Sequence, residues 1–273
     1  MVQDINIPTP FIIGFDGTTL TSDLKTHLQK INPAGIILFK RNILSVNQVK
    51  KLIADIKDLL GPVIVAIDHE GGVVSRFPDD CAIPPSPSAL YFAQSESLIR
   101  EACKIQAELV ASLGFNLNFA PVVDLAVDPD NQVIGCRSFS DNADEVSNYG
   151  KICLEEHEAL RIGTTAKHFP GHGRTAVDSH FATGAVHHSS MGEFNCDLEP
   201  FQKLVQWGVP TIMTAHLTYP IVDSQHPASL SSRLLRDVLR TQLKFSGLII
   251  SDCVEMAGLS QSDDPDSIIT CGL

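Results

Sequence analysis

Short apolar segments rich in β-branched residues alternate with longer amphipathic segments along most of the chain. We expect seven strands, at residues 11–15, 35–39, 63–67, 115–119, 164–169, 210–215 and 247–250. Helical periodicity lies between them, at residues 46–60, 95–113, 143–160, 197–206 and 231–243. Continuous apolar strands are typical of a parallel sheet that is buried on both faces and connected by helical crossovers. The pattern therefore predicts an α/β fold around a parallel sheet.

Two α/β architectures fit this order of elements: a (β/α)8 barrel of the TIM type and a doubly wound open sheet. Polar residues follow or end five consecutive expected strands, namely Asp68, Asp124, His168, His216 and Asp252. In a closed barrel the loops after all strands converge on one mouth, whereas an open sheet concentrates its site where the strand order reverses. The spread over five strands favours the barrel.

Composition limits the kinds of partner. The chain has 273 residues, 44% of them hydrophobic, which is enough for one large globular domain. Its net charge of −12 makes nucleic acid and anionic membranes unfavourable partners. The first ten residues do not resemble a signal peptide, and no apolar run has the length of a membrane span. Seven scattered cysteines without CxxC pairs indicate reduced thiols, so we expect a cytoplasmic protein.

The most polar loop comprises residues 167–174 (KHFPGHGR) and is followed by Asp178 and His180. Its charges are unfavourable in a core unless they are paired, and its glycines and proline indicate a loop. Asp178 could orient the His180 imidazole, which near neutral pH can donate and then accept a proton. A hydrogen-bonded loop pair without a catalytic role fits the spacing equally well.

Charged residues at the other expected strand ends are candidates for binding and catalysis. Asp252 ends the last expected strand. An acid at this place could act as a nucleophile or a general base, or it could cap the next helix. Asp68, in the motif DHEGG and near Arg76, could hold ligand hydroxyls, with the paired glycines allowing a close backbone approach, or it could cap a turn. Arg137, in IGCRSF, could bind a sugar or a carboxylate, or form a surface ion pair.

Taken together, these segments resemble glycoside hydrolase family 3, and within it the β-N-acetylhexosaminidase (NagZ-like) branch. The resemblance runs from about Phe11 to Gly258 and is carried by DHEGG with Arg76, IGCRSF, KHFPGHG with Asp178-Ser179-His180, and SDCVEM at residues 251–256. It implies a (β/α)8 barrel over residues 1–258 that releases terminal N-acetylglucosamine from β-linkages. It also implies a small-molecule sugar as the partner and no metal or other cofactor.

The resemblance implies a retaining double displacement. Asp252 would be the nucleophile, and His180, oriented by Asp178, would be the acid/base residue. The positions that match the sugar-binding residues of the family are Asp68, Arg76, Arg137, Lys167 and His168. Most retaining glycosidases use two carboxylates instead. A neutral imidazole carries no negative charge that would repel an anionic acceptor such as phosphate.

The end of the chain departs from the family pattern. Family members continue past the nucleophile with a helix, an eighth strand and a final helix, whereas residues 259–273 form a polar tail without a counterpart in that pattern. We therefore expect a barrel that lacks its last βα unit, with an open seam between its first and seventh strands. Arg174 also stands where the family usually carries an aspartate.

Two other functions remain open from the residues alone. A metal-dependent barrel hydrolase would use His168, His172, Asp178 and His180 as ligands, since histidines are dense in this loop. A non-catalytic truncated remnant would bind sugar weakly. The remaining histidines that we considered are expected to face solvent: His157, His187 and His188.

Overall fold

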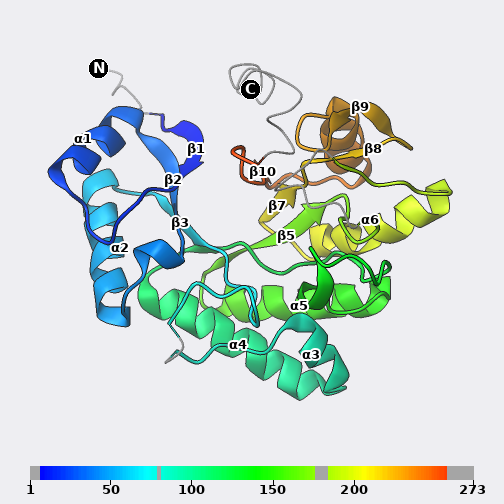
Figure 1. Cartoon of the computed structure of the whole chain (residues 1–273), viewed down its shortest axis with the longest axis horizontal. Coiled ribbons are helices and arrows are strands. Elements are labelled where there is room, and N and C mark those ends of the chain that lie inside the picture. The colour runs from blue at the N-terminus through cyan, green and yellow to red at the C-terminus, as the bar shows by residue number, and fades with distance from the viewer. Residues whose placement is uncertain (1–6, 79–80, 176–183, 257–273) are drawn as a thin grey trace.

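The computed structural model describes residues 7–78, 81–175 and 184–256. Seven strands form one sheet in which every hydrogen-bonded pair is parallel, in the order β1-β2-β3-β4-β5-β7-β10. Their bounds are β1 Thr9–Ile13, β2 Pro33–Leu38, β3 Ile64–Ile67, β4 Leu117–Asn118, β5 Gly163–Phe169, β7 Thr211–Thr214 and β10 Leu248–Ser251. The order rises along the chain without the reversal of a doubly wound sheet. In Figure 1 the strands follow a curved path with β1 and β10 at its two ends.

Helices cover the outer side of this curled sheet (Figure 1). They are α1 Ser22–Ile31, α2 Val46–Leu60, α3 Pro87–Phe92, α4 Glu96–Leu113, α5 Ala143–Ala159 and α6 Met191–Gln206, with short 3-10 turns at Lys40–Asn42 and Gly135–Arg137. The side chains of Ser45, Ser95, Asn142 and Ser190 accept backbone N–H hydrogen bonds at the starts of α2, α4, α5 and α6. None of the helices in the described ranges is long and apolar enough to span a membrane.

The expected parallel α/β fold is confirmed, and all seven expected strands are present. The last expected helix is a π-helix at Arg233–Gln242. Helix α6 begins six residues earlier than expected, because the Ser190 cap and the buried Phe194 extend its apolar face toward the N-terminus. A second sheet of three short strands was not expected: β6 Gly184–Ala185, β8 Leu217–Tyr219 and β9 Asp223–Pro227.

The core lies on both sides of the curled sheet. One buried cluster packs β2 and β3 against α1, α2 and α4, and a larger one packs β5 and β7 against α4, α5 and α6. A third cluster contains Ala66, Leu117, Phe119 and Met213 and borders only further strand residues. Because it includes no helix residue, we infer that it fills the concave side of the sheet. The polar strand ends are thus supported by apolar packing on both faces.

His157 is fully buried in α5, so the expectation that it faces solvent is wrong. Its Nδ1 donates to the carbonyl of Cys153 one turn earlier (2.8 Å), and its Nε2 accepts from Asn118 Nδ2 (3.1 Å). The same amide donates to the carbonyl of His69 and accepts from its backbone N–H. His157 therefore supports, through Asn118, the turn that follows β3. A sequence pattern does not reveal this role, because Asn118 lies 39 residues away.

Acid should destabilise this fold through its buried histidines. Burial lowers the pKa of His69 to about 3 and that of His157 to about 4. Both stay neutral in the folded chain while the unfolded chain takes up protons below about pH 6.5. The two histidines therefore do not reduce the free energy of unfolding above that pH. As the pH drops further, each of them should lower it by about 1.4 kcal/mol per pH unit.

Urea denaturation at a series of pH values measures this slope. His157→Gln removes one titrating group, so its free energy of unfolding should depend less steeply on pH than that of the original chain, by up to about 1.4 kcal/mol per unit. Equal slopes for the two proteins would contradict the assignment of His157 as a buried neutral group.

Candidate active site

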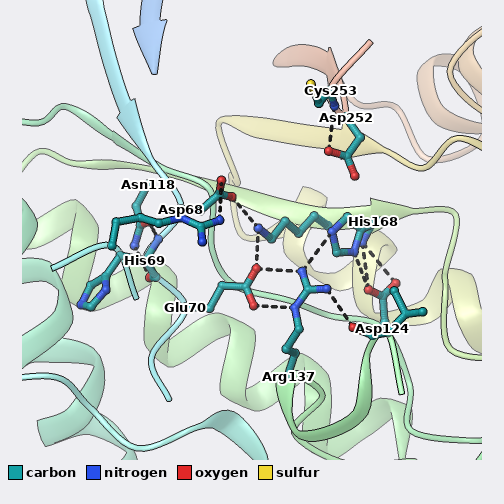
Figure 2. A network of polar contacts seen from close by, with 12 residues as sticks. Asp68, His69, Glu70, Asn118, Asp124, Arg137, His168, Asp252 and Cys253 are labelled. Atoms are coloured by element: carbon teal, nitrogen blue, oxygen red, sulfur yellow. Dashed lines mark hydrogen bonds and ion pairs between the residues drawn. The ribbon is translucent and has the colours of Figure 1, made fainter. Parts of the chain in front are cut away.

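Charged and polar side chains from several strands gather at the carboxyl ends of the sheet (Figure 2). Asp68 comes directly after β3, His168 lies near the end of β5, and Asp252 directly follows β10. Arg137 reaches the same place from the 3-10 turn after β4. This end of a parallel curled sheet is where barrel enzymes carry their active sites.

Glu70 is the centre of an ion-pair network. Its Oε1 is 2.6 Å from Lys167 Nζ, and its carboxylate receives two hydrogen bonds from the Arg137 guanidinium, at 2.8 Å from Nε and 2.9 Å from Nη2. Lys167 Nζ also lies 2.9 Å from Asp68 Oδ1, and Arg76 Nη2 lies 3.4 Å from Asp68 Oδ2. The side chains of Glu70 and Lys167 are only 1% and 3% exposed.

Burial and pairing act in opposite directions on these groups. Burial alone would raise the pKa of Glu70, but the Lys167 and Arg137 cations hold it well below its usual range. Burial alone would lower the pKa of Lys167, but the Asp68 and Glu70 carboxylates raise it above its usual value. Glu70 and Lys167 are therefore both ionised at neutral pH, and the charge of each depends on its partners.

The turn that presents Glu70 depends on its two glycines. Gly71 has a φ of +91°, and a Cβ there would lie 2.7 Å from the carbonyl oxygen of Pro85. A Cβ on Gly72 would lie 2.5 Å from the Cβ of Ser86. The two glycines therefore allow this turn to pack closely against the segment at Pro85 and Ser86, while the close approach to a ligand stays a prediction. Sequence reasoning did not single out Glu70, although an acid beside paired glycines at a strand end was a usable signal.

Asp124 fixes the orientation of His168. Its Oδ2 is 2.7 Å from His168 Nδ1, and its Oδ1 accepts from the backbone N–H groups of His168 (3.1 Å) and His172 (2.7 Å). With Nδ1–H donated to Asp124, His168 Nε2 accepts a long hydrogen bond from Arg137 Nη2 (3.4 Å). Burial would raise the pKa of Asp124, but the two histidines lower it below its usual value.

Asp252 lies opposite this network, and Figure 2 shows its carboxylate pointing toward the side where Asp68 and His168 lie. Its Oδ1 accepts from the backbone N–H of Cys253 (2.8 Å). The carbonyl of Cys253 accepts a hydrogen bond from His216 Nε2 (3.0 Å). The other ring nitrogen of His216, Nδ1, lies 2.8 Å from Ser229 Oγ. Burial would raise the pKa of Asp252, but His168 and His216 hold it below its usual value. An ionised carboxylate in this position can act as a nucleophile.

The structure brings together most of the residues that the sequence indicated. Through Glu70, the five expected sugar-binding residues form one connected group that faces Asp252: Asp68, Arg76, Arg137, Lys167 and His168. The expected acid/base residues, Asp178 and His180, lie outside the described residues. His188 was expected to face solvent, but its side chain is fully buried, whereas His187 is exposed.

The histidines of this loop are not arranged as a metal site within the described ranges. The His168 and His172 rings are 5.9 Å apart and nearly perpendicular, and the Nδ1 of His168 is taken by Asp124. Among the residues that the structure describes, no group of three or more His, Cys, Asp or Glu side chains could hold a metal ion.

Comparisons with known proteins agree with the geometry. A family model described as the glycosyl hydrolase family 3 N terminal domain matches residues 12–268. A β-hexosaminidase from Hydrogenovibrio crunogenus is 34% identical over 269 residues, which cover 96% of this chain and 75% of the relative. A β-hexosaminidase from Psychromonas ingrahamii is 36% identical over 261 residues, covering 92% and 75% of the two chains.

Solved structures show the same similarity. A family 3 β-N-acetylglucosaminidase from Paenibacillus superimposes with a TM-score of 0.87 at 35% identity, covering 91% of this chain and 48% of that one. NagZ from Neisseria gonorrhoeae superimposes with a TM-score of 0.86 at 32% identity, covering 96% and 78%. The same Neisseria protein has been solved in complex with N-trifluoroacetyl-D-glucosamine.

Removing the charge of Glu70 should destabilise the fold. Glu70→Gln leaves the buried Lys167 and the partly buried Arg137 without their shared carboxylate, which should lower the free energy of unfolding by about 3–5 kcal/mol. Urea denaturation at neutral pH measures the difference. Asp55→Asn is the matched control, because it breaks the surface pair with Lys51 and should cost less than about 1 kcal/mol. Similar small losses in both variants would contradict the central place of Glu70.

Proposed function

Because the chain belongs to glycosyl hydrolase family 3, we propose that it is a retaining exo-β-N-acetylhexosaminidase that hydrolyses terminal β-linked N-acetylglucosamine. The observation that carries the proposal is the ionised Asp252 carboxylate held opposite the Asp68, Glu70 and Lys167 network. The names of the curated relatives, β-hexosaminidase, support the choice of sugar.

The network has the donors and acceptors that a sugar ring requires. Asp68 can accept hydrogen bonds from hydroxyl groups, while Lys167, Arg76 and Arg137 can donate to hydroxyl or carbonyl oxygens. His168 adds a ring nitrogen, and the hydrogen bond of its Nδ1 to Asp124 fixes the tautomer of the ring. Because these groups are paired with one another before the sugar arrives, binding requires little rearrangement. We propose that together they hold the hydroxyl and acetamido groups with the anomeric carbon toward Asp252.

The reaction then proceeds in two displacements. In the first, an Asp252 carboxylate oxygen bonds to the anomeric carbon, and the aglycone oxygen leaves with a proton from His180. In the second, His180 takes a proton from water, whose oxygen displaces Asp252 and restores the original anomeric configuration. Asp178 orients His180. The roles of Asp178 and His180 rest on the match of DSH at residues 178–180 to the family motif.

We further propose that the seven parallel strands are the larger part of a (β/α)8 barrel whose mouth is the site described above. The rising strand order and the superposition on family 3 enzymes support this architecture. The domain boundary at residue 258 and the cytoplasmic location stay predictions.

The nucleophile assignment is tested by replacing Asp252. Asp252→Ala should lower kcat/KM for p-nitrophenyl N-acetyl-β-D-glucosaminide by about 10⁴-fold or more, because no other carboxylate of the network points at the anomeric carbon in the proposed pose. The release of p-nitrophenol measures the rate. Glu255→Gln removes the charge of an exposed acid three residues later and should keep the original rate. A rate in Asp252→Ala close to that of the original chain would show that the nucleophile is elsewhere.

A further inference from the structure

Asp197 in α6 holds together two loop segments that flank residues 175–187. Its carboxylate receives hydrogen bonds from Arg174 Nε, at 2.8 and 3.1 Å, and from His188 Nε2, at 2.8 Å. Arg174 ends the loop at residues 170–174 that follows β5, whereas His188 lies just before α6. The Asp197 side chain is only 4% exposed, so these bonds form in a poorly hydrated place where losing them is costly.

The surroundings of Asp197 are closely packed. The buried His188 ring meets Phe194 edge-on, with ring centroids 5.3 Å apart, and lies 6.3 Å from the Tyr219 ring. The Tyr219 hydroxyl donates to the carbonyl of Gly171 (2.9 Å), and a Cβ on Gly171 would lie 2.9 Å from the Cβ of Asp197. One packed unit therefore surrounds this carboxylate. It consists of the loop at residues 170–174, the segment before α6 and α6 itself.

The segment between the two anchored residues carries Asp178 and His180. Fixing the ends of a loop reduces the number of paths that it can take, and proton transfer requires the acid within hydrogen-bond reach of the leaving oxygen. By contrast, Asp252 directly follows β10, and the Glu70 network comes from the turn after β3, from β5 and from the 3-10 turn after β4. A defect at Asp197 would thus act directly on the two residues that flank the acid/base segment, Arg174 and His188.

We propose that Asp197 is a positioning residue for the acid/base step, because it joins Arg174 to His188 and thereby sets the span of the segment that carries His180. The inference rests on the proposed function. It goes beyond that proposal by assigning a role to a carboxylate outside the sugar site, on the helical layer of the fold.

The dependence of rate on the leaving group tests the proposal. A 2,4-dinitrophenolate leaves without a proton, whereas a 4-methoxyphenolate needs one, and kcat/KM reports only the steps up to departure of the aglycone. Asp197→Asn keeps the shape of the side chain but removes its charge. We expect it to lower kcat/KM by about 100-fold for the 4-methoxyphenyl N-acetyl-β-glucosaminide and by less than about threefold for the 2,4-dinitrophenyl glycoside.

The second displacement gives an independent measurement. If His180 is misplaced, water attacks the glycosyl-enzyme slowly, and azide, which needs no general base, should raise kcat of Asp197→Asn for the 2,4-dinitrophenyl substrate. Azide should not raise kcat of the original chain. Arg174→Gln is the second variant in case Asp197→Asn folds poorly. It releases only one end of the segment, so it should lower kcat/KM selectively for the 4-methoxyphenyl substrate, but to a smaller extent.

Asp144→Asn is the matched control, since it breaks the ion pair between Asp144 of α5 and Lys203 of α6 and leaves Asp197 untouched. It should change both rates equally and slightly. Equal losses for the two substrates in Asp197→Asn, or no loss for either, would overturn the positioning role. An original chain that is inactive on both substrates would instead overturn the proposed function.

Discussion

The site depends on one buried carboxylate, that of Glu70, which neutralises the buried Lys167 cation and the partly buried Arg137 cation. Glu70 comes from the turn after β3, Lys167 from β5 and Arg137 from the 3-10 turn after β4, so a single acid joins three segments at the carboxyl end of the sheet. Burying any one of these charges alone would be strongly unfavourable. Their mutual pairing makes the arrangement possible and leaves Asp68, which accepts from Lys167, on the same side as His168.

Much of the fold could be predicted from the sequence, because strand and helix periodicity are local properties. The strands at residues 33–38 and 163–169 and the helix at 46–60 lie close to their expected positions. Three-dimensional pairing is not local. Glu70 and Arg137 are 67 residues apart, and nothing in the sequence marks them as partners. The buried positions of His157 and His188 were missed for the same reason: each is satisfied by a residue on another element.

The candidate site has two parts with different kinds of support. The proposed sugar-binding group and Asp252 come from strand ends and from the segments that follow them, and the parallel sheet and the apolar clusters on both of its faces hold these strands in place. The proposed acid/base residues belong to a segment whose flanking residues, Arg174 and His188, meet at Asp197, on a helix outside the sheet. Such a division would let the sheet hold the sugar rigidly while a separate carboxylate sets the place of the proton donor.

The central claim is that this network presents the anomeric carbon to Asp252. The most direct test is to trap the glycosyl-enzyme with a 5-fluoro N-acetylglucosaminyl fluoride, which slows the second displacement more than the first, and to map the label by peptide mass spectrometry. We predict that one sugar is attached to the peptide containing Asp252 and that the label is released as activity returns. A label on any other residue, or an active enzyme that acquires none, would contradict the account.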